Sequence, residues 1–303
     1  MSSIDTGVMI TYYNPDLTQS RQQLQAIVAQ RGHGQICIVD NSDADRVPAI
    51  QSMVADFPMV HYIPLYENKG IGAAQNVGAA WLYPKNDFVI FFDQDSLPPT
   101  DMLLNLRKSY EQINALGKFK IGAIGPRAIN TQTGEAYRAK LKKGKSSIGD
   151  LPVTQLTEII SSGSLIAKSA WETTGGMDEE LFIDAVDHEW CWRAAAKGQY
   201  SFFIDERVQL VHALGEGDLK ILGFTFTGIP KPLRCYYLYR NFLLLLRREY
   251  VPTYWKIMNT IKFTIKFVCY PLFLPNGKSY FKYIWKGLGD GIKGKGGKIP
   301  GIQ

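Results

Sequence analysis

Two aspartates stand directly after a short apolar run. The run is Phe88–Phe92, and Asp93 and Asp95 follow it. Its β-branched and aromatic residues predict a buried strand. Ligands bind at the carboxyl ends of strands in open α/β sheets, and carboxylate oxygens are ligands that Mg²⁺ and Mn²⁺ prefer. The pattern therefore indicates a metal–diphosphate site, and the alternative is a polar turn that only ends a strand.

A second group of carboxylates lies between Asp178 and Glu189, ahead of an expected helix over Trp190–Lys197. Carboxylates this dense would repel one another on an ordinary surface. The cluster therefore favours a specific use. A carboxylate within hydrogen-bond reach of a substrate hydroxyl can take its proton as a new bond forms.

Alternating strands and helices must position these residues. Helices are expected over Val47–Asp56 and Leu103–Leu116. Apolar runs between the helical segments predict strands at Gly7–Thr11, Ile36–Val39, Val60–Pro64, Ile121–Gly125 and Tyr200–Ile204. This alternation is typical of a largely parallel α/β sheet. Several of these runs end in polar residues, as expected of a nucleotide pocket along one sheet edge.

A segment rich in small residues runs from Asn68 to Gly78. Small side chains let a helix pack close to a sheet or a ligand, and its first N–H groups could meet an anion. It is not a Walker motif, because Lys69 precedes the glycines and no G-K-[ST] follows. A dinucleotide-binding glycine motif would follow the first strand, and none does.

Composition sets wide limits. The chain has 303 residues, 46% hydrophobic and 20% charged, which allows one large domain or a domain with an appendage. Its four cysteines form no C-x-x-C pair, so neither a zinc site nor a disulfide framework is expected. No secretory signal and no spanning apolar window of about 18 residues is recognised.

Four motifs in order, T-Y-Y-N-P, V-D-N-S, N-K-G-I-G-A-A-Q-N-x-G and F-F-D-Q-D-S, resemble those of family-2 inverting glycosyltransferases. The last is similar to the bacterial rhamnosyltransferase branch, and the match runs from Gly7 to His212. The resemblance implies a GT-A fold, Rossmann-like, with a mostly parallel central sheet flanked by helices. We expect this transferase domain over residues 1–229 and a helical, basic-aromatic appendage over residues 230–303.

The resemblance also implies roles for matched positions. Asp187 would be the general base, with Glu189 as a partner. The expected nucleotide-sugar pocket contains Thr11, Tyr13, Asp40, Asn68, Gly72, Asn76, Asp93 and Gln94. The expected metal ligands are Asp93, Asp95 and His212. The expected acceptor side contains Ser162, Gly163, Asp184 and Trp190. By residue type alone, Tyr13 suits a core equally well, and a lone histidine such as His212 is often only structural.

Charge divides the chain. Residues 230–303 carry 14 Lys and Arg against 2 acidic residues, a net charge of +12, whereas residues 1–229 carry −6. Lysines mixed with aromatic residues suit a segment that lies on an anionic membrane. The alternatives are helices packed on the first domain or on a second subunit. No nucleic-acid module accompanies the segment. The basic stretch Arg138–Lys145 is either a solvated face or a mobile loop, and Gly287–Gln303 is expected to be flexible.

These expectations combine into one activity. The chain would transfer L-rhamnose from dTDP-L-rhamnose, with inversion and with Mg²⁺ or Mn²⁺, to a lipid-linked bacterial surface glycan such as O-antigen or cell-wall polysaccharide. It would work in the cytoplasm, peripherally on the inner face of the membrane and without a nucleic-acid partner, with a homo-oligomer as one expected form. The alternatives are a UDP-hexose transferase of the same fold and a non-catalytic scaffold of a glycan assembly complex.

Overall fold

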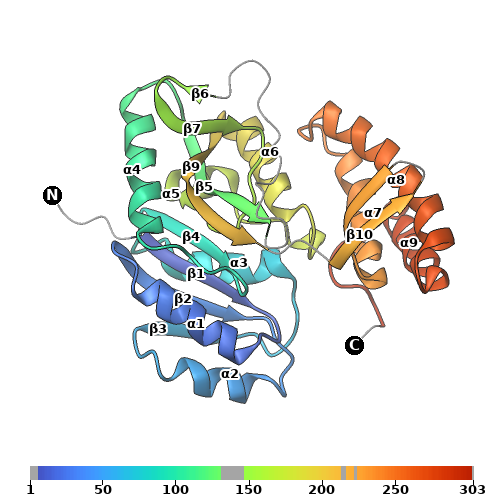
Figure 1. Cartoon of the computed structure of the whole chain (residues 1–303), viewed down its shortest axis with the longest axis horizontal. Coiled ribbons are helices and arrows are strands. Elements are labelled where there is room, and N and C mark those ends of the chain that lie inside the picture. The colour runs from blue at the N-terminus through green and yellow to red at the C-terminus, as the bar shows by residue number, and fades with distance from the viewer. Residues whose placement is uncertain (1–5, 131–146, 213–215, 222–223, 302–303) are drawn as a thin grey trace.

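A computed structural model describes residues 6–130, 147–212, 216–221 and 224–301. The first two thirds of the chain form an α/β layer structure, and a helical block stands at one end (Figure 1). In the described residues, nine strands make one sheet in the order β3-β2-β1-β4-β8-β5-β9-β7-β6. Their bounds are β1 Thr6–Tyr12, β2 His33–Asp40, β3 Val60–Pro64, β4 Phe88–Asp93, β5 Ile121–Asn130, β6 Ser147–Ile148, β7 Leu151–Leu156, β8 Leu165–Ala167 and β9 Ser201–His212.

The sheet is parallel from β3 to β4 and mixed beyond it. β1 pairs in parallel with both β2 and β4, and β5 pairs in parallel with β9. β8 runs antiparallel between β4 and β5. Thr11 pairs with Asp93 and Tyr12 with Asp40, so three strand ends meet at one edge. The expected largely parallel sheet is confirmed, and the structure adds the antiparallel pairing of β8 with β4 and β5.

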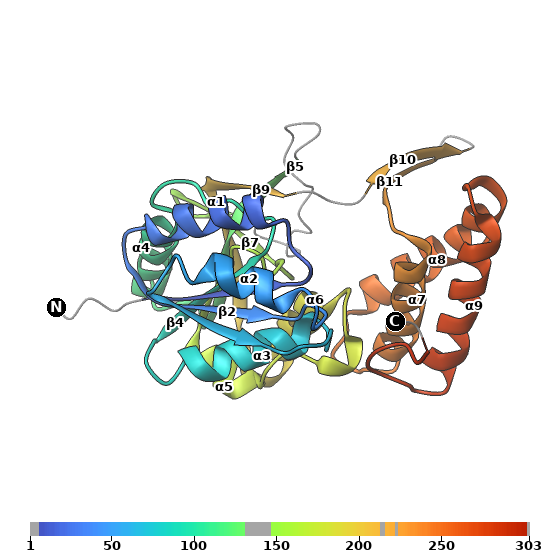
Figure 2. The same ribbon diagram turned by 90° about the horizontal axis from the view of Figure 1, so that it is seen from below.

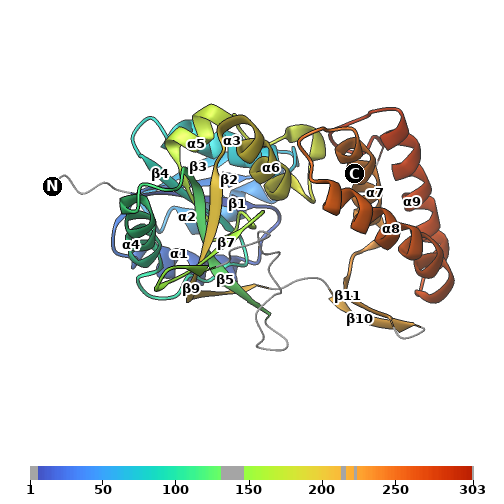
Figure 3. The ribbon, with the colours of Figure 1, turned by 90° about the horizontal axis from the view of Figure 1, so that it is seen from above.

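Helices cover both faces of the sheet. α1, α2 and α4 lie on one face, and α3, α5 and α6 on the other (Figures 2 and 3). Their bounds are α1 Leu17–Val28, α2 Val47–Val54, α3 Ile71–Leu82, α4 Met102–Ala115, α5 Lys168–Thr174 and α6 Val186–Gly198, with a 3₁₀ turn η1 at Glu179–Leu181. α6 begins four residues before the expected start, because Asp187 and Glu189 suit the positive end of a helix dipole.

Small residues decide how closely α3 packs. A Cβ atom at Gly78 would lie 2.6 Å from Cγ of Met9 on β1, and one at Gly72 would lie 3.1 Å from the carbonyl oxygen of Asp178. Only glycine fits the first distance without a shift. The small residues of this segment thus let α3 pack closely against β1 and against the loop that contains Asp178.

The helical block follows a two-stranded hairpin, β10 Glu216–Ile221 and β11 Phe224–Ile229. Its helices are α7 Pro232–Leu246, α8 Thr253–Phe273 and α9 Gly277–Ile292. Buried residues of α7, among them Cys235 and Leu245, belong to the same apolar cluster as the sheet strands. In the described part of the chain, no helix is both long enough and apolar enough to cross a bilayer.

Two expectations about loops have different outcomes. Residues 293–301, which follow α9, are ordered, which corrects the flexibility expected there: Gly297 donates a backbone hydrogen bond to Glu180, and Ile299 is 3% exposed. A buried isoleucine on a glycine-rich tail explains this order, because apolar burial offsets the entropy of ordering it. The basic stretch Arg138–Lys145 lies outside the described residues.

Candidate active site

A cleft of about 550 Å³ opens where β1 and β4 end. Residues from distant parts of the chain form its walls, including the first helix of the helical block. The lining residues are Thr11, Tyr13, Asn41, Asn68, Gly70, Ile71, Gln75, Asp93, Gln94, Asp95, Ile160, Ser161, Ser162, Phe182, Ile183, Asp184, Ala185, Val186, Asp187, His188 and Arg234. The structure therefore brings together Asp93, Asp95 and Asp187, which the sequence places in two separate motifs.

The turn Asp93–Asp95 is fixed from behind by α1. The side-chain amide of Gln23 donates to the carbonyl oxygens of Asp93, at 2.6 Å, and Ser96, at 2.7 Å. Gln94 accepts a hydrogen bond from the backbone N–H of Tyr13 at 2.7 Å. Gln23 is 1% exposed, so this support is a buried feature of the fold. It holds both carboxylates at the floor of the cleft.

A pair of asparagines shapes the opposite wall. Asn41 donates to the side-chain oxygen of Asn68 at 3.2 Å and accepts from the backbone N–H of Lys69 at 2.8 Å. Asn68 in turn accepts from the backbone N–H of Gly70, which has a φ of 92° and caps the start of α3. Positive φ favours glycine there. Gly70 and Ile71 line the cleft, but their N–H groups are already bonded, that of Gly70 to Asn68 and that of Ile71 to the carbonyl oxygen of Phe182.

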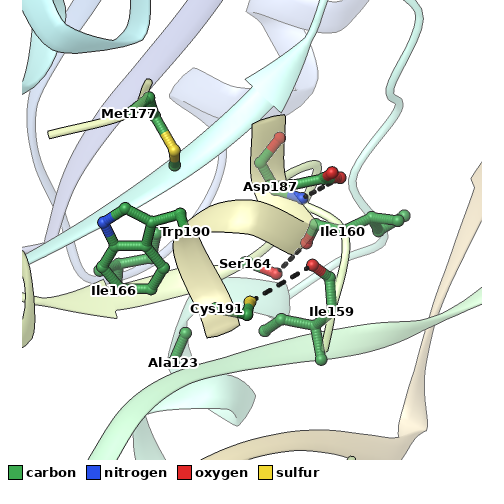
Figure 4. Close-up of a pocket in the computed structure, with 10 residues that line it drawn as sticks. Ala123, Ile159, Ile160, Ser164, Ile166, Met177, Asp187, Trp190 and Cys191 are labelled. Atoms are coloured by element: carbon green, nitrogen blue, oxygen red, sulfur yellow. Dashed lines mark hydrogen bonds between the residues drawn. The ribbon is translucent and has the colours of Figure 1, made fainter. Parts of the chain in front are cut away.

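Asp187 lies in the first turn of α6, with Trp190 and Cys191 one turn further (Figure 4). One oxygen of the Asp187 carboxylate accepts a hydrogen bond from the backbone N–H of His188 at 2.8 Å, and the other accepts one from the backbone N–H of Ser161 at 3.3 Å. Both partners are backbone N–H groups, so they orient the carboxylate without neutralising it. The group is therefore available to a hydroxyl in the cleft.

Negative charge is concentrated in the cleft. Burial, and then the charges of Asp95 and Asp187, raise the pKa of Asp93 to about 7, while Arg234 opposes the rise. Arg234 binds Asp184 at 2.6 Å. Burial alone would lower the pKa of Arg234, but the charges of Asp184, Asp93 and Asp187 raise it.

The donor set fits a hard divalent cation. Asp93 and Asp95 offer carboxylate oxygens, and their excess charge would be relieved by a positive ion. Within the described residues, no three His, Cys, Asp or Glu side chains converge as a complete metal site. Two carboxylates with diphosphate oxygens are the usual arrangement for Mg²⁺, which is held by few protein ligands. His212 ends β9, and its side chain is outside the described part of the structure.

Some expected pocket residues lie behind the cleft wall. Asp40 is fully buried and binds the Tyr62 hydroxyl and the N–H of Ser42. Asn76 bonds with both the N–H and the carbonyl of Met177. Gly72 is where α3 meets the 178 loop. These residues support the wall, and none of them lines the cleft.

The structure also separates the acceptor-side and catalytic candidates. Ser162 and Asp184 line the cleft, whereas Gly163 and Trp190 do not. Gly163 has a φ of 75°, and a Cβ there would meet Leu210 at 2.8 Å. Glu189 is 0% exposed and accepts from Arg193 at 2.7 Å and from Tyr250 at 2.5 Å. The structure thus places Glu189 in a buried ionic cluster outside the cleft.

Sequence reasoning missed several lining residues. Arg234 comes from α7, beyond the motif-bearing part of the chain, and only the tertiary structure brings it to Asp184. Asn41 stands next to the expected Asp40 in V-D-N-S, and strand alternation could have pointed to it, because neighbours face opposite sides. Gln75 and His188 are neighbours of Asn76 and Asp187 in the same motifs.

Comparison with known proteins gives a family and a fold. The model of the family "Glycosyl transferase family 2" matches residues 8–168. The chain is 33% identical over 304 residues, 97% of each chain, to the dTDP-rhamnosyl transferase RfbF of Shigella flexneri.

Solved structures of similar fold are more distant in sequence. TarS of S. aureus, residues 1–349, superposes with a TM-score of 0.56 at 14% identity over 95% of this chain and 80% of that one. The mannosyltransferase PcManGT of Pyrobaculum calidifontis, in complex with GDP-Man and Mn²⁺, gives 0.54 at 15% identity over 97% and 76%. At these identities the likeness shows the fold.

Proposed function

This chain belongs to glycosyl transferase family 2, and we propose that it transfers L-rhamnose from dTDP-L-rhamnose to a hydroxyl of a lipid-linked bacterial surface glycan. The family match and the fold confirm the expected GT-A glycosyltransferase. The observation that carries the donor is the 33% identity, along 97% of both chains, to a dTDP-rhamnosyl transferase. A scaffold without activity is disfavoured, because three carboxylates still meet in one cleft.

The cleft carboxylates have different tasks in the proposed mechanism. Asp187 accepts the proton of the acceptor hydroxyl while the hydroxyl oxygen attacks the anomeric carbon and the bond from that carbon to the diphosphate breaks. Its two backbone N–H partners keep the carboxylate oriented. One base and no covalent intermediate give inversion, and a diphosphate leaving group needs no protonating acid.

Asp93 and Asp95 would hold Mg²⁺ or Mn²⁺ through the β4 turn that Gln23 fixes. When bound, the ion supplies positive charge to the diphosphate as it leaves. Arg234 adds a second positive charge from α7. Asn68 lines the same cleft and can offer its side-chain amide to the donor.

The acceptor side of the proposal rests on an outer face of α8 and α9. Exposed apolar side chains form two stripes, one on α8 and one on α9, and their helical spacing places each stripe on one side of its helix. Their side chains are between 47% and 70% exposed and comprise Ile257, Met258, Ile261, Val268, Leu272, Phe281, Trp285 and Ile292. The α9 stripe lies beside α8, because the rings of Phe267 on α8 and Phe281 in the α9 stripe lie 6.2 Å apart.

Charge complementarity suggests what covers this outer face. No Asp or Glu occurs between Glu249 and Asp290, whereas Lys278 and Lys282 are exposed beside the α9 stripe. Apolar side chains rimmed by lysines suit the interface of an anionic membrane. We therefore propose that the enzyme works on the inner face of the bacterial cytoplasmic membrane, where a lipid-linked acceptor would be found.

The donor is tested by thermal shift and by transfer. With Mn²⁺ present, dTDP should raise the melting temperature more than UDP, GDP or CDP, because binding to the folded state alone stabilises it. dTDP-rhamnose should then be consumed in the presence of the acceptor. A stronger response to UDP would replace the donor with a UDP-hexose, and no response to any nucleotide would favour the scaffold.

The membrane is tested by vesicle sedimentation. Vesicles of phosphatidylglycerol and phosphatidylcholine should bind the protein, less at high salt, and the double change Ile261→Glu with Trp285→Glu should abolish binding. Met59→Glu is the control, because Met59 is 53% exposed on the first domain. A dimer in solution that the double change dissolves would instead assign the outer face to a second copy.

A further inference from the structure

The turn before Asp187 has a strained backbone. Phe182, Asp184 and Ala185 have φ values of 62°, 68° and 62°. Non-glycine residues in this region are strained and persist only where their surroundings hold them. The same turn, Phe182–Ala185, forms one wall of the cleft. Something outside the turn must therefore fix it.

Asn241 of α7 supplies part of that restraint. Its side-chain amide donates to the carbonyl oxygens of Leu181 at 2.9 Å, Ile183 at 2.7 Å and Asp184 at 3.0 Å. Asn241 is 2% exposed. Three carbonyls converging on one buried amide nitrogen fix the path of the backbone through the turn, since those of Ile183 and Asp184 would otherwise lose this buried donor.

Arg240 supplies the rest. It is 0% exposed and donates to the carbonyl oxygens of Glu180 at 3.0 Å and Leu181 at 2.8 Å, as well as to Gly297. It also donates to the side-chain oxygen of Asn241, which orients that amide. Its guanidinium carbon also lies 5.5 and 5.0 Å from the ring centroids of Tyr236 and Tyr237. Burying a cation to bond backbone carbonyls costs free energy of folding, so stability by itself does not explain Arg240.

On its other side, the turn contacts Gly70 and Ile71 at the start of α3. The N–H of Ile71 donates to the carbonyl oxygen of Phe182 at 2.8 Å. A Cβ atom at Gly70 would lie 2.6 Å from the same oxygen. The turn is therefore packed between α7 and the start of α3, directly before the helix that carries Asp187.

We propose that Arg240 and Asn241 are positioning residues for the transfer reaction, acting through the turn Phe182–Ala185 on Asp187. The inference rests on the proposed role of Asp187. Without these donors the turn relaxes toward ordinary backbone angles and displaces the carboxylate. A displacement of about 1 Å at a reacting group costs roughly 10²-fold in rate.

Asn241→Leu tests the proposal, because leucine keeps the volume and removes the amide. Asn241→Ser is the milder second variant. Asn259→Leu is the matched control, since the Asn259 amide donates to Trp255 within its own helix. We expect faster amide hydrogen exchange over residues 181–189 in both Asn241 variants but not in the control. With dTDP-rhamnose, kcat should fall by roughly 10²-fold and the donor KM should change far less.

Three results would decide against parts of this account. Unchanged exchange over 181–189 in both Asn241 variants overturns the restraint, whatever the activity. Faster exchange with wild-type kcat overturns the positioning role. An inactive wild-type protein overturns the proposed function alone, because hydrogen exchange reads the restraint without any substrate.

Discussion

Carboxylates of the cleft lie close enough to influence one another's protonation. Burial and the charges of Asp95 and Asp187 raise the pKa of Asp93. The charge of Arg234 acts in the opposite direction. Such a site binds cations readily and repels a bare diphosphate. The donor therefore needs positive charge from an ion and from Arg234.

Asp187→Asn should leave donor binding intact and slow transfer by about 10² to 10⁴-fold, because an amide cannot accept the proton. Initial rates with dTDP-rhamnose and calorimetry with dTDP and Mn²⁺ would measure the two effects. Asp45→Asn is the control, since Asp45 is exposed and does not line the cleft. Turnover close to that of the wild type would remove Asp187 from its assigned role.

Arg234→Ala should weaken dTDP binding by roughly 10- to 100-fold, as expected for a charged hydrogen bond worth about 1.5–3 kcal/mol. Arg234→Lys keeps the charge and should lose less. Arg247→Ala, an exposed arginine at the other end of α7, is the control. Calorimetry gives the affinities. Equal affinity in Arg234→Ala would mean that Arg234 only neutralises Asp184.

At the scale of elements, α8 is apolar on two opposite sides. Phe263 packs against Tyr239 and Phe242 of α7, with ring centroids 5.0 and 4.9 Å apart. Lys266 also faces this side and is 8% exposed. Its Nζ atom lies 5.3 Å from the centroid of Tyr270. A buried lysine here costs stability, which gives a measurable pH dependence.

Burial, with a smaller effect of the Lys262 charge, lowers the pKa of Lys266 to about 8 from 10.5. Between these values the unfolded chain binds the proton that the folded chain has lost, so stability rises with pH across this window. Below pH 8 the full penalty applies, about 3 kcal/mol by the usual conversion.

Lys266→Met should therefore raise the free energy of unfolding at pH 7, and its advantage should shrink toward pH 10.5. Denaturant unfolding at several pH values, wild type against variant, measures the difference and cancels the titration of other groups. Lys282→Met, at an exposed lysine, is the control. An advantage independent of pH would show that packing, not charge, is responsible.

At the scale of the molecule, the proposed boundary at residue 229 crosses an extensive interface. Arg248 of the helical block binds Asp178 and lies 3.3 Å from Glu189. The rings of Trp192 and Trp255 lie 5.1 Å apart across it. The division into residues 1–229 and 230–303 stays a prediction about the sequence, and the contacts favour one folding unit.

A fragment of residues 1–229 should therefore fail to form a donor-binding fold. It would remove Arg248 and Tyr250 from Glu189, which would keep only Arg193 among these partners. It would also expose apolar side chains such as Trp192, which packs on Trp255 of α8. Circular dichroism melting and the dTDP thermal shift would test it, with the full chain alongside. A cooperative transition with full-length dTDP affinity would make residues 230–303 a separable appendage.

The sequence by itself determined the parallel strands of the sheet, the motifs that follow them and the turn at Asp93–Asp95. These follow from local patterns, because strand periodicity and polar strand ends act over a few residues. It also determined the charge division at residue 230 and the apolar stripes of the last helices. Local chemistry was sufficient for each of these features.

Only the tertiary structure decided which of those residues meet. Glu189 resembles a catalytic partner in D-H-E-W, yet Arg193 and Tyr250 hold it in a buried cluster. Arg234 and Asn241 lie in a segment that reads as an appendage, yet they reach Asp184 and the turn beside it. Contacts between residues about 50 to 60 positions apart depend on how whole helices pack. No local pattern contains that information.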